Sequence, residues 1–431
     1  MQINRDYYLN KLIRKKNNNK IKVITGIRRV GKSYLLFNIY KDYLLSIGIK
    51  EEQIITLKLD KWENIEYRKL DNLYNYIKQR TNDPNKMYYV FIDEIQYCET
   101  IKQTNNTGYE QILTFVDVIL SFYDNPNIDL YITGSNSKML STDILTNFRG
   151  RSSQIKVHPL VFSEINYLFE NNEQALDHYI NYGGLPEVYL NQTIEEKKQY
   201  LTNQFEEIYL KDIKERYNIQ KDLIVLETLL KFVSSAIGSF INPTKLQNRF
   251  KSEMKTDISA STISNYLSYF ENSFILSHIE KYDVKGNKHF SSINKYYFND
   301  IGLRNACINY RQIEKKHIIE NIIYNELVKR DYSVYVGSVI QQITIDNKRT
   351  TKQLEVDFVA EMASKRYYIQ FAMNVYTKQK KDQEINSLLK IKDNFKKIVI
   401  IYDDIEPRYD ENGILYIGLK QFLLDPNVID F

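Results

Sequence analysis

The sequence is poor in the features that mark disulfide-rich, cysteine-metal and membrane-spanning proteins. Only two cysteines are present, Cys98 and Cys307, and they lie far apart in the chain. Neither a disulfide framework nor a cysteine metal site is therefore indicated. No apolar run approaches the roughly 18 residues that a bilayer-spanning helix needs, and the first residues carry no signal-peptide core. We therefore expect a cytoplasmic chain without a membrane span.

An excess of one charge is also lacking. The formal net charge is +5, with 43% hydrophobic and 26% charged residues, which is ordinary for a globular protein. Such a mild positive charge permits contact with nucleic acid but does not argue for it. The 431 residues are too many for a single core, and this length predicts roughly two to four domains.

What the sequence does contain is a phosphate-binding loop. Residues 26–33, GIRRVGKS, match the pattern G-x-x-x-x-G-K-[ST]. An apolar run that predicts a buried strand, residues 21–25, precedes the loop, and a helical pattern, residues 34–40, follows it. The two glycines let the backbone approach phosphate oxygens closely, and the helix N-terminus attracts anions. We predict that Lys32 reaches the β- and γ-phosphates of ATP and that Ser33 holds Mg²⁺. The complete predicted ATP-binding set is Gly26, Ile27, Arg28, Arg29, Val30, Gly31, Lys32, Ser33 and Tyr34.

Two carboxylates end the next apolar run, residues 88–94. A buried strand that ends in Asp93 and Glu94 would open onto the nucleotide. Asp93 is predicted to bind Mg²⁺, directly or through water, and Glu94 to act as the general base or to orient the attacking water. The alternative for Glu94 is a solvated strand end. The pair favours hydrolysis over phosphate transfer to a metabolite.

A third apolar run, residues 128–136, ends in small polar residues. Ser135 or Asn136 is predicted to position the attacking water near the γ-phosphate, and a plain turn is the alternative. A further strand is expected at residues 54–59 and a helical pattern at residues 109–123. This alternation predicts a parallel sheet with helices on both faces and ligands at the carboxyl ends of its strands.

Arginines are candidates for a finger that completes the site. Arg149 and Arg151 flank Gly150 after the third strand, and such a residue contributes roughly 10³–10⁵ in rate. We favour Arg151, with a surface arginine pair as the alternative. Arg28 and Arg29 inside the loop could serve as charge clamps or as partner contacts.

Several runs together resemble a known family. GIRRVGKS, YYVFIDEIQ, LYITGSNS and FRGRSSQIKVHPLVFSEI, followed by YGGLPEVYL, ISASTISNYLSYFENSFIL, IENIIYNELVKR and EVDFVAE, are similar to AAA-family ATPases of bacteria and archaea that carry an uncharacterised C-terminal region. The resemblance implies an α/β fold: a P-loop NTPase parallel sheet with helices on both faces, then an all-α and winged-helix region, then a restriction-endonuclease-like α/β domain. The expected boundaries are 1–160 for the ATP-binding domain, 161–220 for a helical linker or lid, 221–298 for the winged-helix module and 299–431 for the terminal domain.

The middle modules can be tested on their residues. The pattern of residues 193–217, without Gly or Pro, predicts one long helix. Residues 259–272 predict the second helix of a helix-turn-helix, with Ile263, Tyr266, Leu267 and Phe270 on its core face. Its outward residues, Ser261, Thr262, Asn265, Ser268 and Tyr269, include no cation, so this helix alone is a poor reader of DNA. A following hairpin with Lys281, Lys285 and Lys288 could supply a basic wing. DNA binding and protein docking therefore both stay open.

The terminal domain resembles metal-dependent nucleases, but part of their pattern is missing. Alternation over residues 354–359 puts Glu355 and Asp357 on one strand face, and with Glu320 they resemble a divalent-metal site. The next strand should carry Glu-x-Lys, yet residues 370–372 read Gln-Phe-Ala. Losing the carboxylate and the ammonium is severe for metal-assisted hydrolysis. We predict a binding-only fold, with a residual second metal site at Glu320 and Asp357 as the alternative.

The sequence thus predicts an ATP-binding protein, with ATP and Mg²⁺ as cofactors, that hydrolyses ATP and couples nucleotide state to contact with a DNA or protein partner. One alternative is a nuclease gated by the ATPase, and another is a nucleotide-dependent adaptor that scarcely hydrolyses ATP. An arginine acting in trans would require a homo-oligomer.

Overall fold

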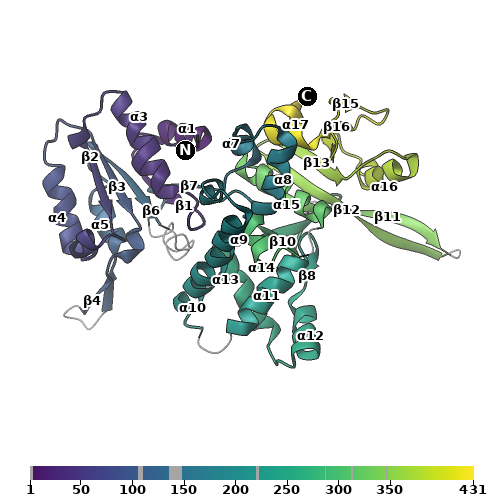
Figure 1. The fold of residues 1–431 in the computed structure, drawn as a ribbon, viewed down its shortest axis with the longest axis horizontal. Coiled ribbons are helices and arrows are strands. Elements are labelled where there is room, and N and C mark those ends of the chain that lie inside the picture. The colour runs from purple at the N-terminus through teal and green to yellow at the C-terminus, as the bar shows by residue number, and fades with distance from the viewer. Residues whose placement is uncertain are drawn as a thin grey trace. The chain divides into compact units, whose positions relative to one another are not determined.

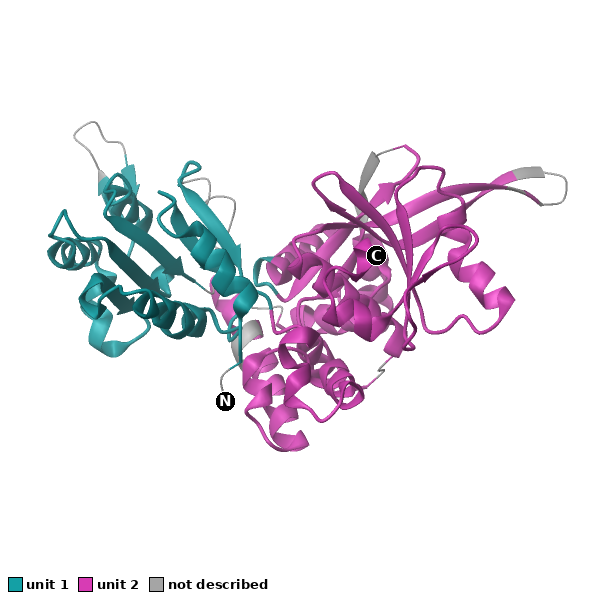
Figure 2. Ribbon diagram, turned by 90° about the horizontal axis from the view of Figure 1, so that it is seen from above, with its two compact units in different colours: residues 1–158, 272–274 teal, residues 159–271, 275–431 magenta. Residues whose placement is uncertain are grey.

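The computed structural model of the chain describes residues 3–104, 110–134, 148–219, 223–286, 288–311, 314–345 and 348–431. It divides into two compact units (Figure 2). Unit 1 comprises residues 1–158 and 272–274, and unit 2 comprises residues 159–271 and 275–431. No helix within the described ranges combines the length and apolar character needed to cross a membrane.

Unit 1 is built on a five-stranded sheet in the order β2-β3-β6-β1-β7 (Figure 1). Every neighbouring pair in it is parallel. The parallel sheet, and the four strands expected at residues 21–25, 54–59, 88–94 and from residue 128, are therefore confirmed. The strands are β1 (Ile21–Thr25), β2 (Ile54–Lys58), β3 (Tyr88–Asp93), β6 (Ile128–Thr133) and β7 (Ser152–Lys156).

Successive residues of these buried strands point to opposite sides of the sheet, so both faces carry apolar side chains. Helices cover both faces and bury them. On one face, alternate residues such as Val23 pack in a core with Leu73 of α4 and Ile119 of α5. On the other face, Tyr40 packs against Phe91 and Tyr131, with ring centroids 5.8 and 5.1 Å apart. This three-layer arrangement is the P-loop NTPase fold expected from the sequence. The helices of unit 1 are α1 (Asp6–Lys15), α2 (Lys32–Tyr34), the π-helical η1 (Leu35–Tyr40), α3 (Lys41–Ser46), η2 (Glu51–Gln53), η3 (Trp62–Arg68), α4 (Leu70–Arg80), η4 (Ile95–Tyr97) and α5 (Phe115–Ser121).

The helical pattern expected at residues 109–123 is wrong in its first part. Glu110–Leu113 forms strand β5, which pairs antiparallel with β4 (Ile101–Thr104). The helix α5 starts only at Phe115, because the Thr114 hydroxyl accepts a hydrogen bond from the Val116 N–H at 3.2 Å and caps it there. An apolar pattern of this length fits either state, and strand pairing decided the outcome.

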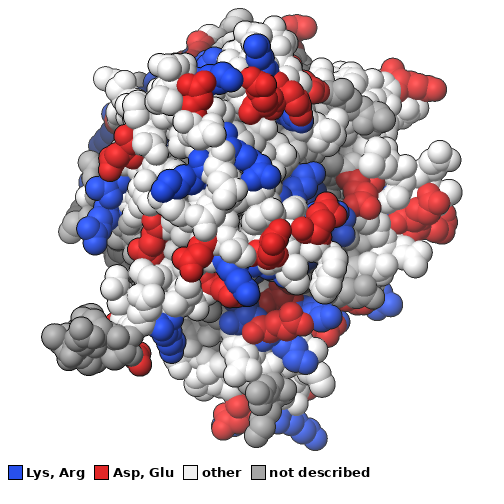
Figure 3. Space-filling model, turned by 90° about the vertical axis from the view of Figure 1, so that its left-hand side faces the viewer, with Lys and Arg blue, Asp and Glu red and all other residues white. Residues whose placement is uncertain are grey.

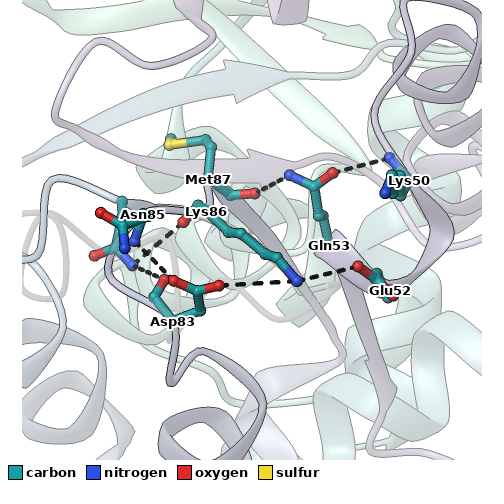
Figure 4. A network of polar contacts seen from close by, with 8 residues as sticks. Lys50, Glu52, Gln53, Asp83, Asn85, Lys86 and Met87 are labelled. Carbon is teal, nitrogen blue, oxygen red and sulfur yellow. Dashed lines mark hydrogen bonds and ion pairs between the residues drawn. The ribbon is translucent and has the colours of Figure 1, made fainter.

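A polar network joins the segments that lead into β2 and β3 (Figure 4). Lys86 Nζ lies 3.3 Å from Glu52 Oε1 and 3.8 Å from Asp83 Oδ2. The Gln53 amide donates to the Met87 carbonyl at 2.8 Å. Because both strands begin here, this network marks the amino edge of the sheet, opposite the edge where the phosphate-binding loop lies.

Unit 2 begins with a helical region. The long helix expected at residues 193–217 is present as a continuous run of α9, η8 and α10, with a π-helical segment in its middle. The elements of this region are α7 (Phe162–Ile165), η6 (Asn166–Leu168), α8 (Asn172–Tyr182), η7 (Pro186–Tyr189), α9 (Ile194–Asn203), η8 (Gln204–Leu210) and α10 (Lys211–Arg216).

A helix-strand-helix-helix-hairpin segment follows. On its third helix the predicted core face is confirmed, since Ile263, Tyr266, Leu267 and Phe270 are all buried. The hairpin continues into a larger mixed sheet in the order β15-β16-β14-β13-β12-β11-β9-β10-β8. The elements of the segment are α11 (Leu223–Ser235), β8 (Phe240–Ile241), α12 (Pro243–Met254), α13 (Ala260–Asn272), β9 (Leu276–Asp283) and β10 (Lys288–Phe298).

The rest of unit 2 completes that sheet and its covering helices. Its core includes Val356, Val359, Tyr368 and Val399 of the sheet, packed with Leu388 of α16. Figures 1 and 2 show the β11–β12 hairpin extending beyond the remainder of the sheet. These elements are α14 (Ile301–Cys307), α15 (Lys315–Lys329), β11 (Ser333–Ile345), β12 (Lys348–Met362), β13 (Lys365–Ala372), α16 (Lys378–Leu389), β14 (Lys396–Ile401), β15 (Arg408–Tyr409), β16 (Leu415–Gly418), α17 (Leu419–Leu424) and η9 (Val428–Asp430).

The run YGGLP has a packing role within unit 2. The Asp300 carboxylate accepts hydrogen bonds from the N–H groups of Gly184 and Leu303, at 2.7 and 2.9 Å. A Cβ atom on Gly184 would lie 2.0 Å from the Leu160 carbonyl oxygen, and one on Gly302 would lie 2.0 Å from the carbonyl oxygen of Tyr182. Glycine is therefore required at both places, where the helical region and α14 meet.

Candidate nucleotide site

The phosphate-binding loop leaves the carboxyl end of β1 in a conformation that only glycine adopts without strain. Gly26 has φ +146°, and a Cβ atom there would lie 2.2 Å from the Val157 carbonyl oxygen. Gly31 has φ +92° and directly precedes α2. The two glycines shape a narrow main-chain loop directly before a helix N-terminus, which is the arrangement that binds phosphate.

Lys32 turns its side chain back over this loop. Its Nζ donates to the carbonyls of Gly26 and Ile27, at 3.0 and 3.1 Å, and only 4% of the residue is exposed. Burial lowers the pKa of Lys32 to about 8, although Glu94 and Asp93 nearby favour its charged form. The ammonium group thus lies inside the loop, near the carboxylates of Asp93 and Glu94, where it can bind an anion.

Asp93 connects three elements. Its Oδ1 accepts a hydrogen bond from the Ser33 hydroxyl at 3.0 Å and another from the Thr133 hydroxyl at the end of β6. Thr133 in turn accepts from the main-chain N–H of Glu94 at 3.2 Å. Burial raises the pKa of Asp93, while the hydrogen bonds from Thr133 and Ser33 oppose that shift.

Glu94 lies at a sharp bend after β3. Its φ of +51° is left-handed, a conformation that costs about 1 kcal/mol or more in a residue with a side chain. The Gln96 amide donates to Glu94 Oε2. The bend and this hydrogen bond orient the carboxylate, which is half-buried.

The other predicted nucleotide contacts lie at different places. Arg28 and Arg29 are in the loop, with Arg29 exposed at φ +65°. Tyr34, one residue after Ser33, is 43% exposed. Ser135 and Asn136 lie outside the described residues.

Arg151 lies at the opposite edge of the sheet from the loop. Its carbonyl accepts from the N–H of Ile21, the first residue of β1, at 2.9 Å, and its guanidinium stands 5.3 Å from the Tyr123 ring centre. The loop begins after Thr25, which is roughly 13 Å further along the strand. Because Arg151 precedes β7, which is parallel to β1, it lies at the amino edge of the sheet and away from the loop of its own chain.

In unit 2, the structure brings Glu320 and Asp357 together with a lysine that the sequence did not suggest. Both carboxylates are buried, at 3% and 6% exposed, and so is Lys295. Lys295 Nζ lies 2.5 Å from Glu355 Oε1. Burial, reinforced by Glu320, raises the pKa of Asp357 to about 8. Within the described ranges no group of three or more His, Cys, Asp or Glu side chains is arranged to hold a metal ion.

The side chains of Gln370 and Asp357 join β13 and β12 through two hydrogen bonds to main-chain N–H groups. Gln370 Oε1 accepts from the Asp357 N–H at 3.3 Å, while Asp357 Oδ2 accepts from the Phe371 N–H at 2.8 Å. A bulge occurs here, because Asp357 and Phe358 together face the single residue Val336 of β11. Both side chains thus satisfy main-chain groups where β12 and β13 separate.

The loop residues and Asp93 are suited to bind Mg²⁺ and a nucleoside triphosphate. Ser33 and Asp93 bring two hard oxygen donors together, which is the donor type that Mg²⁺ prefers. The glycine-shaped main chain and the buried Lys32 ammonium supply the anion site beside them. At Glu320 and Asp357 the fit to a metal is poor, because Lys295 already supplies positive charge and Gln370 adds none.

Three contributors were not foreseen from the sequence. Thr133 could have been found, because β3 and β6 are parallel with Ile92 opposite Ile132, which makes Asp93 and Thr133 neighbours. Gln96 lies only two residues beyond Glu94. Lys295 carried no signal, since it comes from a hairpin strand 60 residues before Glu355.

Comparison with known proteins agrees with a nucleotide site at the phosphate-binding loop. Residues 18–166 match an AAA domain, and residues 173–314 match a domain of unknown function (DUF8612). An uncharacterized protein of Haemophilus influenzae is 34% identical over 429 residues, covering 98% of both chains. The chain belongs to the AAA family. Another relative of this AAA-family chain, an uncharacterized protein of Methanocaldococcus jannaschii, is 29% identical over 412 residues and covers 90% of this chain and 83% of its own.

Solved structures with a similar fold include a Walker-type ATPase of Pyrococcus abyssi. It is 11% identical, with a TM-score of 0.47, over 71% of this AAA-family chain and 96% of its own. The Orc1 protein of Aeropyrum pernix, solved in complex with DNA, is 12% identical with a TM-score of 0.27, over 72% and 93% of the two chains. Similarities at these TM-scores carry no functional argument.

Proposed function

We propose that this AAA-family chain binds Mg-ATP and hydrolyses it. The observation that carries the proposal is the hydrogen bond from Ser33 of the loop to Asp93 of β3, with Glu94 directly after Asp93. A lone phosphate-binding loop would indicate nucleotide binding only. The added carboxylate supports a hydrolytic role, because it lies at a left-handed bend and accepts a hydrogen bond from the Gln96 amide.

Each residue would then have a distinct task. Lys32 would bind the β- and γ-phosphates, and Ser33 with Asp93 would hold Mg²⁺. Bound Mg²⁺ would neutralise charge on the phosphate oxygens. Glu94 would accept a proton from the attacking water or orient that water, with Gln96 fixing the direction of its carboxylate. Ser135 or Asn136 would position the same water.

An arginine finger, if it is Arg151, would have to come from another copy of the chain. The place of Arg151 at the amino edge of the sheet is compatible only with action in trans. A finger role for Arg151 therefore requires a homo-oligomer in which one subunit presents Arg151 to the loop of the next.

The test is the rate of ATP turnover in the presence of Mg²⁺ for the wild type, Lys32→Ala and Glu94→Gln. We expect both variants to lose at least about 100-fold. Lys32→Ala should also lose ATP binding, whereas Glu94→Gln should retain it. Equal turnover by all three proteins would show that the hydrolysis proposal is wrong, and ATP binding without turnover in the wild type would favour the adaptor alternative.

We further propose that nucleotide state changes contact with a partner through unit 2, with working boundaries at residues 160, 220 and 298. The order helix-strand-helix-helix-hairpin over residues 223–298 supports a winged-helix module. Its α13 surface offers little for DNA, because Tyr269 is stacked on Tyr217 with ring centres 3.6 Å apart. On the hairpin, Lys281 is half-buried, and its Nζ lies 5.4 Å from the Phe240 ring centre.

Among the described residues, the face drawn in Figure 3 shows no cationic patch that would favour DNA. On the face drawn in Figure 3, the coloured Lys and Arg side chains are interspersed with Asp and Glu and do not gather into one patch. Non-specific DNA binding depends on concentrated phosphate contacts from cations. We propose a protein partner, because the outward residues of α13 include no cation and its Tyr269 is already stacked on Tyr217.

We propose that the terminal domain binds without cutting. Two observations support this: the hydrogen bonds of Asp357 and Gln370 with main-chain groups, and the ion pair of Lys295 with Glu355. Both already use carboxylate oxygens that a metal ion would need. Incubating plasmid DNA with the full chain, ATP and either Mg²⁺ or Mn²⁺ tests it. We expect no cleavage, whereas cleavage that Asp357→Ala abolishes would establish the nuclease alternative.

A further inference from the structure

Strand β11 has an edge that is only partly covered. It pairs with β12 along its whole length, but on its other side β9 pairs only with Val336, Gly337 and Ser338. The last bond on that side runs from the Val284 N–H to the Ser338 carbonyl at 3.1 Å. Within the described residues, Val339 to Gln342 have no strand partner on that side. Every second residue there turns its N–H and C=O away from β12.

A groove of about 830 Å³ lies along this open edge. Part of its lining is apolar and exposed, since Phe395 is 41% exposed. Val284 and Val339 add a buried apolar base.

The rim of the groove is cationic. Lys285, Lys390 and Lys392 line it and are all exposed. Within the part of the chain that the structure describes, none of the three forms an ion pair. The one lining carboxylate, Asp393, is already engaged, because it accepts from the Tyr368 hydroxyl at 2.6 Å. Arg366 also lines the groove, but it is paired with Glu361 and contacts the rings of Tyr282 and Phe395, so we do not count it among the rim cations.

We propose that the open edge of β11 is a docking site for an extended acidic segment of a partner protein, which adds a strand beside Val339–Gln342. A polypeptide strand can satisfy both the free N–H and the free C=O groups of the edge. The phosphodiester backbone of a DNA strand brings acceptors for the N–H groups and the lysines, but it has no regularly spaced donors for the carbonyls. Alternate side chains of the added strand would point toward the groove, where carboxylates meet the three lysines.

This site lies within unit 2 and does not depend on the proposed hydrolysis. Lysines beside a strand edge can also act only to prevent aggregation, and in that case no peptide is selected. The experiment must therefore distinguish selection of an acidic strand from plain repulsion of other edges and from nucleic-acid binding.

The experiment selects decapeptides from a fully randomised library on the full-length chain without nucleotide, so that its outcome is independent of ATP turnover. The wild type is compared with the groove variant Lys390→Glu/Lys392→Glu. Its matched control is Lys245→Glu/Lys251→Glu, which changes two exposed lysines of α12 that do not line the groove. We expect the wild type and the control to enrich Asp and Glu at alternate positions at least about threefold, and the groove variant to lose that enrichment.

The selected consensus peptide then tests strand pairing. Methylating the main-chain nitrogens of every second residue should weaken binding at least about tenfold in one of the two possible phases and little in the other, because only one set faces β11. Three results would overturn the proposal: no acidic enrichment, an enrichment that Lys390→Glu/Lys392→Glu leaves unchanged, or equal binding of both methylated phases. A 30-nucleotide oligo-dT that binds the wild type and loses at least tenfold in the groove variant, with no peptide selected, would assign the groove to nucleic acid.

Discussion

The Ser33 hydroxyl donates a hydrogen bond to Asp93 Oδ1 over 3.0 Å, and so joins two segments that lie 60 residues apart in the chain. The contact exists because β1 and β3 are both parallel strands that end at the same edge of the sheet, with β6 between them. Thr133 at the end of β6 completes the arrangement by donating to the same oxygen. The loop and the acidic strand end therefore form one preorganised oxygen cluster.

Asp93→Asn keeps the size of this side chain and its ability to accept from Ser33, but removes the negative charge. We expect the kcat of ATP hydrolysis to fall at least about 100-fold, or roughly 2.7 kcal/mol in activation free energy, while ATP binding without Mg²⁺ stays within about twofold. Steady-state turnover and equilibrium binding check this. Asp83→Asn, in the network at the amino edge (Figure 4), is the matched control and should turn over like the wild type. Unchanged kcat in Asp93→Asn would remove the metal role from this residue.

The pKa of Lys32 predicts proton uptake on ATP binding. Because burial lowers that pKa to about 8, the free site is largely deprotonated at pH 9. Bound phosphates favour the charged ammonium, so binding at pH 9 should take up close to one proton and weaken as the pH rises beyond 8. Calorimetry in two buffers of different ionisation enthalpy measures this uptake. Lys32→Arg stays charged and should show almost none, and equal uptake by both proteins would contradict the assignment.

Gly26 and Gly48 offer a matched pair of substitutions in unit 1. Both have positive φ, but a Cβ atom on Gly26 would lie 2.2 Å from a carbonyl oxygen, whereas nothing lies within 4 Å of one on Gly48. Gly48→Ala should therefore cost only about 1–2 kcal/mol of backbone strain and retain ATP binding. Gly26→Ala should lower the Tm further and abolish ATP binding. Thermal melts with and without ATP test the pair, and retained binding by Gly26→Ala would be inconsistent with the loop described.

Local signals were sufficient for the nucleotide half of the molecule. The strand at residues 21–25, the loop after it and the strand ending in Asp93 were predicted closely, because each is a short apolar run bounded by polar or glycine residues. The hairpin at residues 101–113 was not predicted, since its residues 110–113 also suit a helix and only pairing with β4 distinguishes the two.

Contacts between distant strands could not be predicted in the same way. The hydrogen bonds between the Asp357 and Gln370 segments depend on a bulge in β12, and Lys295 contacts Glu355 from another strand of the sheet. Arg151 was predicted as a candidate arginine finger because it follows the third strand in sequence, and action in trans was part of that prediction. Its true edge depends on β7 running parallel to β1, with Ser152 opposite Ile21.

Gln96 is predicted to be a positioning residue for Glu94, because its amide donates to Glu94 Oε2. Gln96→Ala should lower kcat about tenfold, roughly 1.4 kcal/mol, with KM within about twofold, since the carboxylate loses its orientation but the loop is untouched. Steady-state kinetics separate the two constants. Gln53→Ala removes an amide at the amino edge and should leave both unchanged. A rise in KM at constant kcat would instead place Gln96 in nucleotide binding.

Asp357 predicts how the stability of unit 2 depends on pH. Burial, reinforced by Glu320, raises its pKa from 3.8 to about 8. A carboxyl group that holds its proton more tightly in the folded chain stabilises folding at low pH, and this contribution is lost as the pH rises from about 4 to about 8. Asp357→Asn stays neutral and can still accept from the Phe371 N–H, so it should melt like the wild type at pH 5 and at least about 3 °C higher at pH 9. Thermal melts at both values test this, with Asp382→Asn, an exposed carboxylate of α16, as the control that should follow the wild type. A lower Tm for Asp357→Asn at pH 9 would mean that the cluster needs this negative charge, as a metal site would.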